Sequence, residues 1–148
     1  MSVLVTKSAE ETKAVAREFA RAIASEFPKG KAATVIALSG PLGAGKTTFA
    51  QGFAEGLGVK EKVKSPTFIL MREHRIERRH FTRFYHLDCY RLERSKEAAA
   101  IGLLEVLAHP ENLVLIEWAE KIKGALPHKK IIVKFFHVGE HSRKISFS

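Results

Sequence analysis

Apolar residues along the chain follow patterns that alternate between strand and helix. Short apolar runs at residues 34–38 and 113–116 are typical of buried strands. Ser8, with Glu11 three positions later, predicts a capping box at the start of a helix that continues to about Phe27. Pro28 and the residues after it end this helix. Its apolar face is predicted to comprise Val15, Phe19, Ala22 and Ile23.

Shorter elements are predicted in the rest of the chain. Residues 85–90 alternate as a strand does, with Asp88 near the end, and residues 48–54 can begin a helix that ends near Gly56. The remaining predicted elements are an edge strand at 3–6, a hairpin with an exposed basic tip at 72–83, an amphipathic helix at 91–109 with Ile101, Leu104 and Leu107 on one face, a short helix at 119–123, and an antiparallel pair at 131–136 and 143–147.

The most specific local signal is the stretch of residues 40–47, Gly-Pro-Leu-Gly-Ala-Gly-Lys-Thr, between a predicted strand and a predicted helix. This is the G-x-x-x-x-G-K-T pattern of a phosphate-binding loop. Its glycines let the backbone N–H groups approach phosphate oxygens, and the helix N-terminus favours negative charge. In this pattern Lys46 reaches the β- and γ-phosphates and the Thr47 hydroxyl binds Mg²⁺.

A second signal is an acid at the end of a buried strand. The apolar run 113–116 is followed by Glu117, at the carboxyl end of the sheet where α/β proteins bind ligands. An acid at such a position can hold Mg²⁺ directly or through water, and it is otherwise costly to bury. Trp118, the next residue, either covers the nucleotide or packs in the core. We expect His86 and His109 to be structural, since their spacing does not form a zinc site.

Two further stretches have a structural and a functional interpretation. Ser65-Pro66 predicts a turn that enters a strand, and this hydroxyl-bearing loop follows the phosphate-loop helix, where nucleotide-sensing switch segments are often found. The arginine-rich stretch 72–83 either contacts RNA phosphates or is a solvated turn. The residues alone leave both alternatives open.

Length and composition narrow the class of protein. A chain of 148 residues with 45% apolar residues is expected to form one domain with a hydrophobic core, residues 1–148. Its single cysteine excludes an internal disulfide, and it has no signal-peptide core or membrane-length apolar run, so we expect a soluble cytoplasmic protein. The formal charge of +9 favours an anionic partner or reflects a solvated basic surface.

Taken together, these motifs resemble the bacterial TsaE (YjeE) family, the small ATPases needed to form threonylcarbamoyladenosine in tRNA. The order and spacing agree over nearly the whole chain, and the Ser-Pro-Thr and His-Leu-Asp stretches are more specific than the phosphate loop alone. The residues that carry the resemblance are 43–49, Gly52-Phe53, 63–68, 86–92, Glu117-Trp118, Leu126-Pro127 and 8–12.

This resemblance implies an α/β fold, a P-loop NTPase-like three-layer sandwich whose central, mostly parallel sheet has antiparallel strands at one side. It also implies that ATP binds with Mg²⁺ and that the protein acts with TsaB and TsaD. ATP turnover would reset their complex between rounds of tRNA modification, with tRNA reached through the complex or directly through the basic surface. The chain would be a slow ATPase that its partners activate, with no membrane involvement.

The resemblance also assigns expected roles to residues. Catalysis would involve Lys46, Asp88 and Glu117, and Mg²⁺ would be held by Thr47, Asp88 and Glu117. Which of the two acids binds the metal and which orients water is left open. The expected nucleotide-binding residues are Ala9, Thr12, Gly40, Leu42, Gly43, Ala44, Gly45, Lys46, Thr47, Thr48, Ser65, Thr67, Trp118, Ser142 and Arg143.

One position departs from the family pattern. Pro41 stands directly after the first glycine of the loop, where the family usually has aspartate, and proline removes one N–H from the loop. We expect altered hydrolysis or loop rigidity rather than loss of ATP binding. Two other functions are compatible with the motifs: a small P-loop kinase, and a basic RNA-binding protein that only senses nucleotide.

Overall fold

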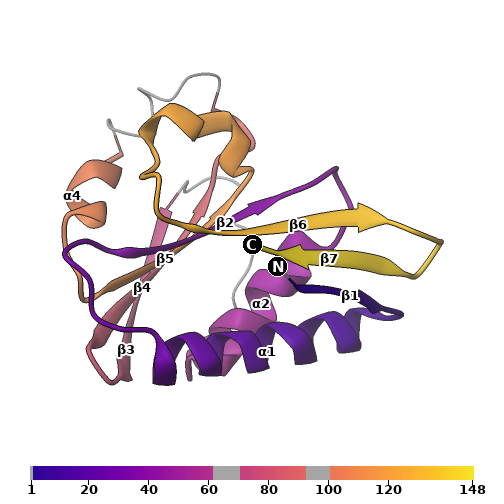
Figure 1. Ribbon diagram of the computed structural model, residues 1–148, viewed down its shortest axis with the longest axis horizontal. Coiled ribbons are helices and arrows are strands. Elements are labelled where there is room, and N and C mark those ends of the chain that lie inside the picture. The colour runs from indigo at the N-terminus through magenta and orange to yellow at the C-terminus, as the bar shows by residue number, and fades with distance from the viewer. Residues whose placement is uncertain (1, 62–70, 93–100) are drawn as a thin grey trace.

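A computed structural model describes residues 2–61, 71–92 and 101–148. They form one seven-stranded sheet in the order β1-β7-β6-β2-β5-β4-β3 (Figure 1). The strands are β1 (Ser2–Thr6), β2 (Thr34–Ser39), β3 (Met71–Arg78), β4 (Phe81–Asp88), β5 (Asn112–Glu117), β6 (Ile131–His137) and β7 (Arg143–Phe147). The helices are α1 (Ala9–Glu26), α2 (Lys46–Gly56), α4 (Leu103–Leu107) and η1 (Ala119–Ala125), which is a 3₁₀ helix.

The centre of the sheet is parallel and its edges are antiparallel. Strands β6, β2, β5 and β4 pair in parallel, with the buried β2 and β5 in the middle as their continuous apolar runs predict. The β3–β4 hairpin forms one edge, and β7 and β1 form the other. Antiparallel strands therefore lie at both edges of the sheet, whereas the family resemblance implied antiparallel strands at one side. The predicted hairpin, edge strand and final antiparallel pair are all present.

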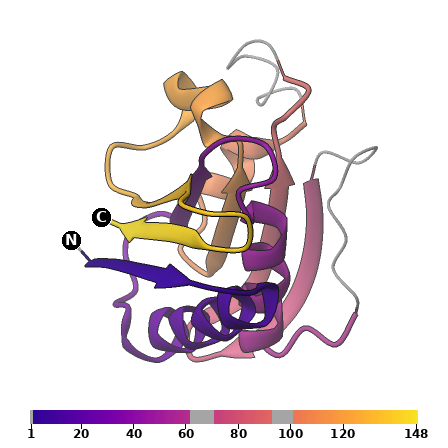
Figure 2. The ribbon, with the colours of Figure 1, turned by 90° about the vertical axis from the view of Figure 1, so that its right-hand side faces the viewer.

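Helices cover both faces of the sheet and so make three layers. Helices α1 and α2 lie together on one face, over a core that includes Phe49, Phe53 and Phe84 (Figures 1 and 2). The other face carries a second apolar cluster, in which Leu103 and Val106 of α4 and Ile122 of η1 pack against β2, β4 and β5. The phosphate loop and the carboxyl ends of the parallel strands are thus held between two packed layers.

Helix α1 begins as predicted, with one difference in its capping bonds. The Ser8 Oγ accepts a hydrogen bond from the Glu11 backbone N–H at 3.1 Å. The Glu11 carboxylate in turn accepts from the N–H of Lys7 at 2.5 Å, one residue before the position that a capping box would use. Within the helix, the prediction for Ala22 was wrong: its side chain is exposed, and Ala20 and Ala24 are buried instead.

Helix α2 packs closely against α1 because it carries glycine at the contact. A Cβ on Gly52 would lie 2.5 Å from the carbonyl oxygen and 2.7 Å from the Cα of Lys13 on α1. Such distances are shorter than packed atoms tolerate, so a larger side chain would push the helices apart. Because Gly52 has no side chain, α1 can lie close to α2, next to the phosphate loop.

The helix predicted at 91–109 is confirmed only in part by the described residues. Helix α4 comprises only Leu103–Leu107, and Gly102 before it has a φ of 89°, a left-handed conformation that interrupts a helix. The expected apolar face is also wrong in part, because Leu104 is 55% exposed. Residues 93–100 lie outside the described residues, as do Ser65 and Thr67. No helix in the described ranges is both long and apolar enough to span a membrane.

Candidate functional site

The glycine loop connects the end of β2 to the beginning of α2. Gly40 has a φ of 144°, and a Cβ there would lie 2.6 Å from the carbonyl oxygen of Phe135 on the neighbouring strand β6. Gly45 has a φ of 102° and caps α2 with no side-chain hydrogen bond, and the first turn of α2 contains no acidic residue. The backbone N–H groups at the N-terminus of α2 therefore have no capping side chain, and they are available to bind an anion.

Lys46, the first residue of α2, is held inside the loop. Its side chain is buried, and its Nζ donates hydrogen bonds to the carbonyl oxygens of Gly40 and Pro41, the latter at 3.0 Å. Burial lowers the pKa of the ammonium, and the carboxylates of Glu120, Glu117 and Asp88 oppose that shift. A phosphate oxygen in the loop would offer this cation a full negative charge in place of carbonyl dipoles.

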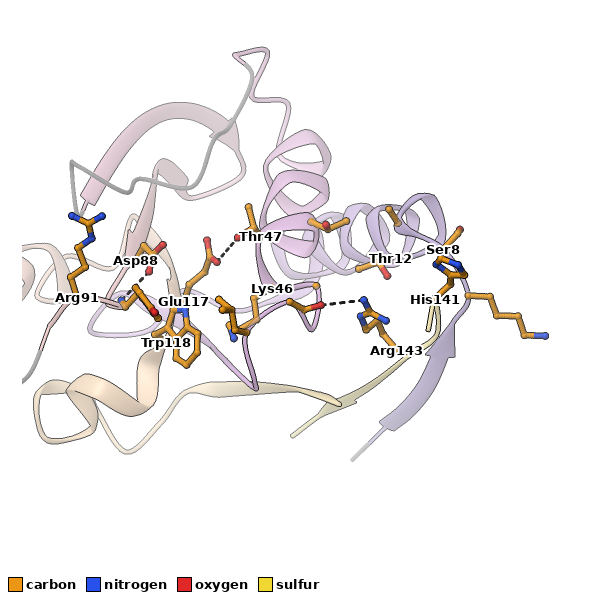
Figure 3. Close-up of a pocket in the computed structure, with 17 residues that line it drawn as sticks. Ser8, Thr12, Lys46, Thr47, Asp88, Arg91, Glu117, Trp118, His141 and Arg143 are labelled. Atoms are coloured by element: carbon orange, nitrogen blue, oxygen red, sulfur yellow. Dashed lines mark hydrogen bonds between the residues drawn. The ribbon is translucent and has the colours of Figure 1, made fainter. Parts of the chain in front are cut away.

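Glu117 ends β5 and meets the phosphate loop. The residue is 1% exposed, and its Oε1 accepts a hydrogen bond from the Thr47 hydroxyl at 2.9 Å (Figure 3). The other carboxylate oxygen, Oε2, lies 2.6 Å from Nε2 of the buried His86 on β4. The sequence suggested only a structural role for His86, so this contact was missed. The parallel register that pairs Leu38 with Glu117 brings the loop and the acid together.

Asp88 lies beside Glu117 at the same end of the sheet. The two acids are partners in the register of β4 and β5, and Asp88 Oδ1 accepts a hydrogen bond from the N–H of Tyr90 at 3.0 Å. A hydroxyl and carboxylates at the mouth of a phosphate loop are the hard oxygen ligands that Mg²⁺ prefers. A cation would also offset the cost of two adjacent acids that are each less than 10% exposed. The residues present therefore fit Mg²⁺.

These groups line one cavity of about 690 Å³, which is in the range of small-molecule sites. Of the predicted site residues, it brings together Ala9, Thr12, Leu42, Gly43, Gly45, Lys46, Thr47, Thr48, Asp88, Glu117, Trp118 and Arg143. Gly40, Ala44 and Ser142 are not among its lining residues, although Gly40 and Ala44 belong to the loop itself. The roles of all these residues remain predictions.

Additional residues line the cavity that were not among the predicted nucleotide-binding residues: Lys7, Ser8, Tyr90, Arg91 and His141. Ser8 lies in the stretch 8–12, and Tyr90 and Arg91 in the stretch 86–92, both of which carried the family resemblance. Lys7 and His141 were not predicted, because Lys7 follows β1 and His141 lies in the β6–β7 turn, and the pairing of β1 with β7 brings them together.

The carboxyl end of the chain closes the cavity beside the glycine loop. Arg143, the first residue of β7, donates to the carbonyl oxygen of Gly43 at 3.1 Å (Figure 3). It also donates to the carbonyl oxygen of Ser142 at 3.0 Å. From the other end of the chain, the Thr12 hydroxyl in the first turns of α1 is hydrogen-bonded to that of Thr6 on β1 at 2.7 Å. Segments from both ends of the chain thus form the wall opposite Asp88 and Trp118.

Comparison with known proteins assigns the chain to a family. A family model described as "Threonylcarbamoyl adenosine biosynthesis protein TsaE" matches residues 6–145. The chain belongs to the TsaE family. This confirms the resemblance drawn from the motifs, and the loop, Asp88 and Glu117 all lie within the matched TsaE region.

Individual TsaE relatives agree with the family assignment. The chain is 38% identical to the tRNA threonylcarbamoyladenosine biosynthesis protein TsaE of Bacillus subtilis, over 97% of this chain and 82% of that protein. It is 40% identical to the protein of the same name from Haemophilus influenzae, over 68% of this chain and 61% of that protein.

A solved structure extends the comparison to the fold. The crystal structure of YdiB from Bacillus subtilis superposes with a TM-score of 0.76 at 34% identity, covering 99% of this chain and 83% of that one. The predicted P-loop NTPase-like α/β class is therefore confirmed.

Proposed function

We propose that this TsaE-family protein is a slow, Mg²⁺-dependent ATPase that acts with TsaB and TsaD to form the threonylcarbamoyl group on adenosine 37 of tRNAs. One observation carries the nucleotide part of the proposal: the 2.9 Å hydrogen bond that joins Thr47 of the glycine loop to Glu117 at the end of β5. It unites two of the three predicted metal ligands at the mouth of an anion-binding loop. The pathway is supported by the relatives' names, which refer to tRNA threonylcarbamoyladenosine biosynthesis.

The loop and Lys46 supply the phosphate grip in this proposal. Backbone N–H groups of the loop and of the beginning of α2 donate to the phosphate oxygens, and Lys46 exchanges its carbonyl partners for the β- and γ-phosphates. Thr47 and Glu117 hold the Mg²⁺, which when bound neutralises charge on the phosphates. The geometry favours Asp88 as the group that orients the attacking water, because the Thr47 hydroxyl already contacts the other acid.

Slow turnover by the isolated chain follows from the cations around the cavity. The guanidinium of Arg143 donates to backbone carbonyls of Gly43 and Ser142, so it stabilises the loop. In this arrangement its N–H groups are engaged by the backbone. A partner that supplies or reorients a cation would raise the rate, which makes control by TsaB and TsaD chemically reasonable. We propose that tRNA is reached through that complex.

Phosphate release from ATP, measured with and without the TsaB–TsaD pair, tests this function. We expect a low rate for the chain alone, a clear increase with both partners, and no hydrolysis by Lys46→Ala in either case. Transfer of phosphate to a small acceptor faster than to water would instead indicate a kinase. Salt-sensitive tRNA binding without hydrolysis, even with the partners present, would indicate an RNA-binding protein.

A further inference from the structure

His86 is a buried polar residue directly behind the predicted metal ligand. Its side chain is fully buried, and Nε2 lies 2.6 Å from Oε2 of Glu117. With an ionised Glu117, Nε2 carries the proton and donates to the carboxylate. The other ring nitrogen, Nδ1, is buried without a hydrogen-bond partner among the described residues. Every polar contact found for this ring in the described part of the chain is therefore directed at Glu117.

The strand register explains why the two side chains meet. His86 precedes Asp88 by two positions on β4, so both side chains project from the same face of the sheet. Because Asp88 is opposite Glu117 in the β4–β5 register and His86 is opposite Leu115, the ring lies one step deeper than the two acids. Phe84, two positions earlier on the same face, is fully buried. The ring therefore sits between the apolar core and the carboxylate.

Packing alone does not account for a histidine here. An apolar side chain could fill this space without leaving a ring nitrogen buried and unpartnered, which is an unfavourable state for a polar group. The gain that offsets this cost is control of Glu117. With Oε2 bonded to His86, the carboxylate cannot rotate freely, and Oε1 remains directed at Thr47. Hydrogen bonds of this kind commonly orient carboxylates that bind metals.

We propose that His86 is the positioning residue for Glu117, holding one carboxylate oxygen so that the other stays available to Mg²⁺ beside Thr47. This inference rests on the proposed function and adds to it a residue that acts only through the metal ligand. Its consequence is specific. Loss of the Nε2 donor weakens the binding of Mg²⁺ with nucleotide, while the loop still binds nucleotide without metal.

The test compares His86→Asn with His86→Gln. The amide nitrogen of glutamine can reach the position of the histidine Nε2, whereas that of asparagine is too short to do so. For each variant, the affinity for a fluorescent ATP analogue is measured by titrating Mg²⁺ and again in EDTA. We expect His86→Asn to raise the half-saturating Mg²⁺ concentration by about 10–100-fold while its affinity in EDTA is unchanged. His86→Gln should restore most of the Mg²⁺ response.

His74 provides the matched control, because it is also a buried histidine, on the adjacent strand β3, and packs against Phe84. His74→Asn should lower the thermal unfolding temperature without changing the Mg²⁺ response. If His86→Asn kept the wild-type Mg²⁺ response, or lost affinity equally with and without Mg²⁺, the inference would be overturned and the proposed function would stand. If the wild-type protein bound the analogue with no effect of Mg²⁺, both would be overturned.

Discussion

The Nζ of Lys46 lies 3.7 Å from the centroid of the Trp118 ring, while it donates to the loop carbonyls of Gly40 and Pro41. Trp118 follows Glu117 directly and has a φ of 58°. Its ring packs against that of Tyr90, with 5.1 Å between the ring centroids. The backbone conformation at Trp118 is uncommon for a bulky residue, and it turns the ring toward the loop. The sequence left open whether this side chain covers the site or packs in the core. In the structure it lines the cavity and also packs against the second apolar cluster, and its contact with nucleotide stays a prediction.

This contact makes Trp118 a reporter of Lys46. Since Trp118 is the only tryptophan in the chain, its fluorescence should change when ATP with Mg²⁺ draws Lys46 away from the ring. Lys46→Ala should change the baseline fluorescence and abolish the response together with ATP binding or turnover. Lys121→Ala is the control, because the Nζ of Lys121 lies over the ring of Tyr90 instead, 5.9 Å from its centroid. Full ATPase activity in Lys46→Ala would contradict the phosphate-binding role.

Glu117 should matter more for metal than for nucleotide. Glu117→Ala removes the acceptor of the Thr47 hydroxyl bond and leaves the buried His86 without its partner. We expect nucleotide affinity to fall more in Mg²⁺ than in EDTA, and the free energy of unfolding to fall by about 1–3 kcal/mol. Isothermal titration in both buffers and urea unfolding measure the two effects. Glu111→Ala, at the opposite end of β5, should leave both quantities near wild type. Equal losses of affinity in the two buffers would remove Glu117 from the metal site.

Asp88 should affect the rate of hydrolysis and leave nucleotide affinity unchanged. Asp88→Asn keeps an oxygen that can accept the Tyr90 N–H bond, so the local backbone is preserved while the charge is lost. We expect the affinity for ATP with Mg²⁺ to stay close to wild type and turnover with partners to fall by about 100-fold or more. A single-turnover assay beside a binding titration separates these quantities. A large loss of affinity with unchanged turnover would assign Asp88 to the metal instead.

The parts of the site that could be predicted from sequence are those that local motifs or strand ends define. Lys46 and Thr47 follow from the loop pattern, and Glu117 follows from its place after an apolar run. His86 could not be assigned, because its contact with Glu117 depends on which strands are neighbours and in what register. His141 reaches the cavity through the β6–β7 turn, for which the family resemblance indicated only the neighbouring Ser142 and Arg143.

The errors in the fold prediction have physical causes of the same kind. The stretch 91–109 is rich in alanine and amphipathic, which favours a helix, but Gly102 has a positive φ and α4 begins directly after it. In α1, Ala22 fits the helical spacing, yet the buried stripe is set by how closely α2 approaches. Ala20 and Ala24 are buried instead, and Ala20 lies against Gly56 of α2. Spacing predicts that a helix has an apolar face, and packing determines which small residues belong to it.

The close contact of α1 with α2 predicts a strong effect of a small substitution. Gly52→Ala would place a Cβ 2.5 Å from the Lys13 carbonyl oxygen, and backbone atoms cannot move aside as a flexible side chain can. We expect the free energy of unfolding to fall by about 1–3 kcal/mol, because overpacking outweighs the better helix propensity of alanine. Gly30→Ala, where the nearest atom would be 3.8 Å away, should change it by less than about 0.5 kcal/mol. Urea unfolding of both variants checks the comparison.

The buried thiol of Cys89 should make the stability of the fold depend on pH. Burial raises the pKa of its thiol to about 12, and the carboxylates of Asp88 and Glu117 add to that shift. Above about pH 8.5 the unfolded chain loses a proton that the folded protein keeps, so this thiol makes stability fall as pH rises toward 12. The contribution is at most about 1.4 kcal/mol per pH unit.

Cys89→Ala separates this effect from the titration of lysines and tyrosines. Between pH 8 and pH 10, the free energy of unfolding should fall less in Cys89→Ala than in the wild type. The native thiol should also react with iodoacetamide far more slowly than the urea-unfolded chain, because a buried thiol supplies little thiolate. The cysteine is the only one in the sequence, so the labelling has a single origin. Equal labelling rates in the folded and unfolded protein would show that the thiol is accessible and would contradict its burial in the second apolar cluster.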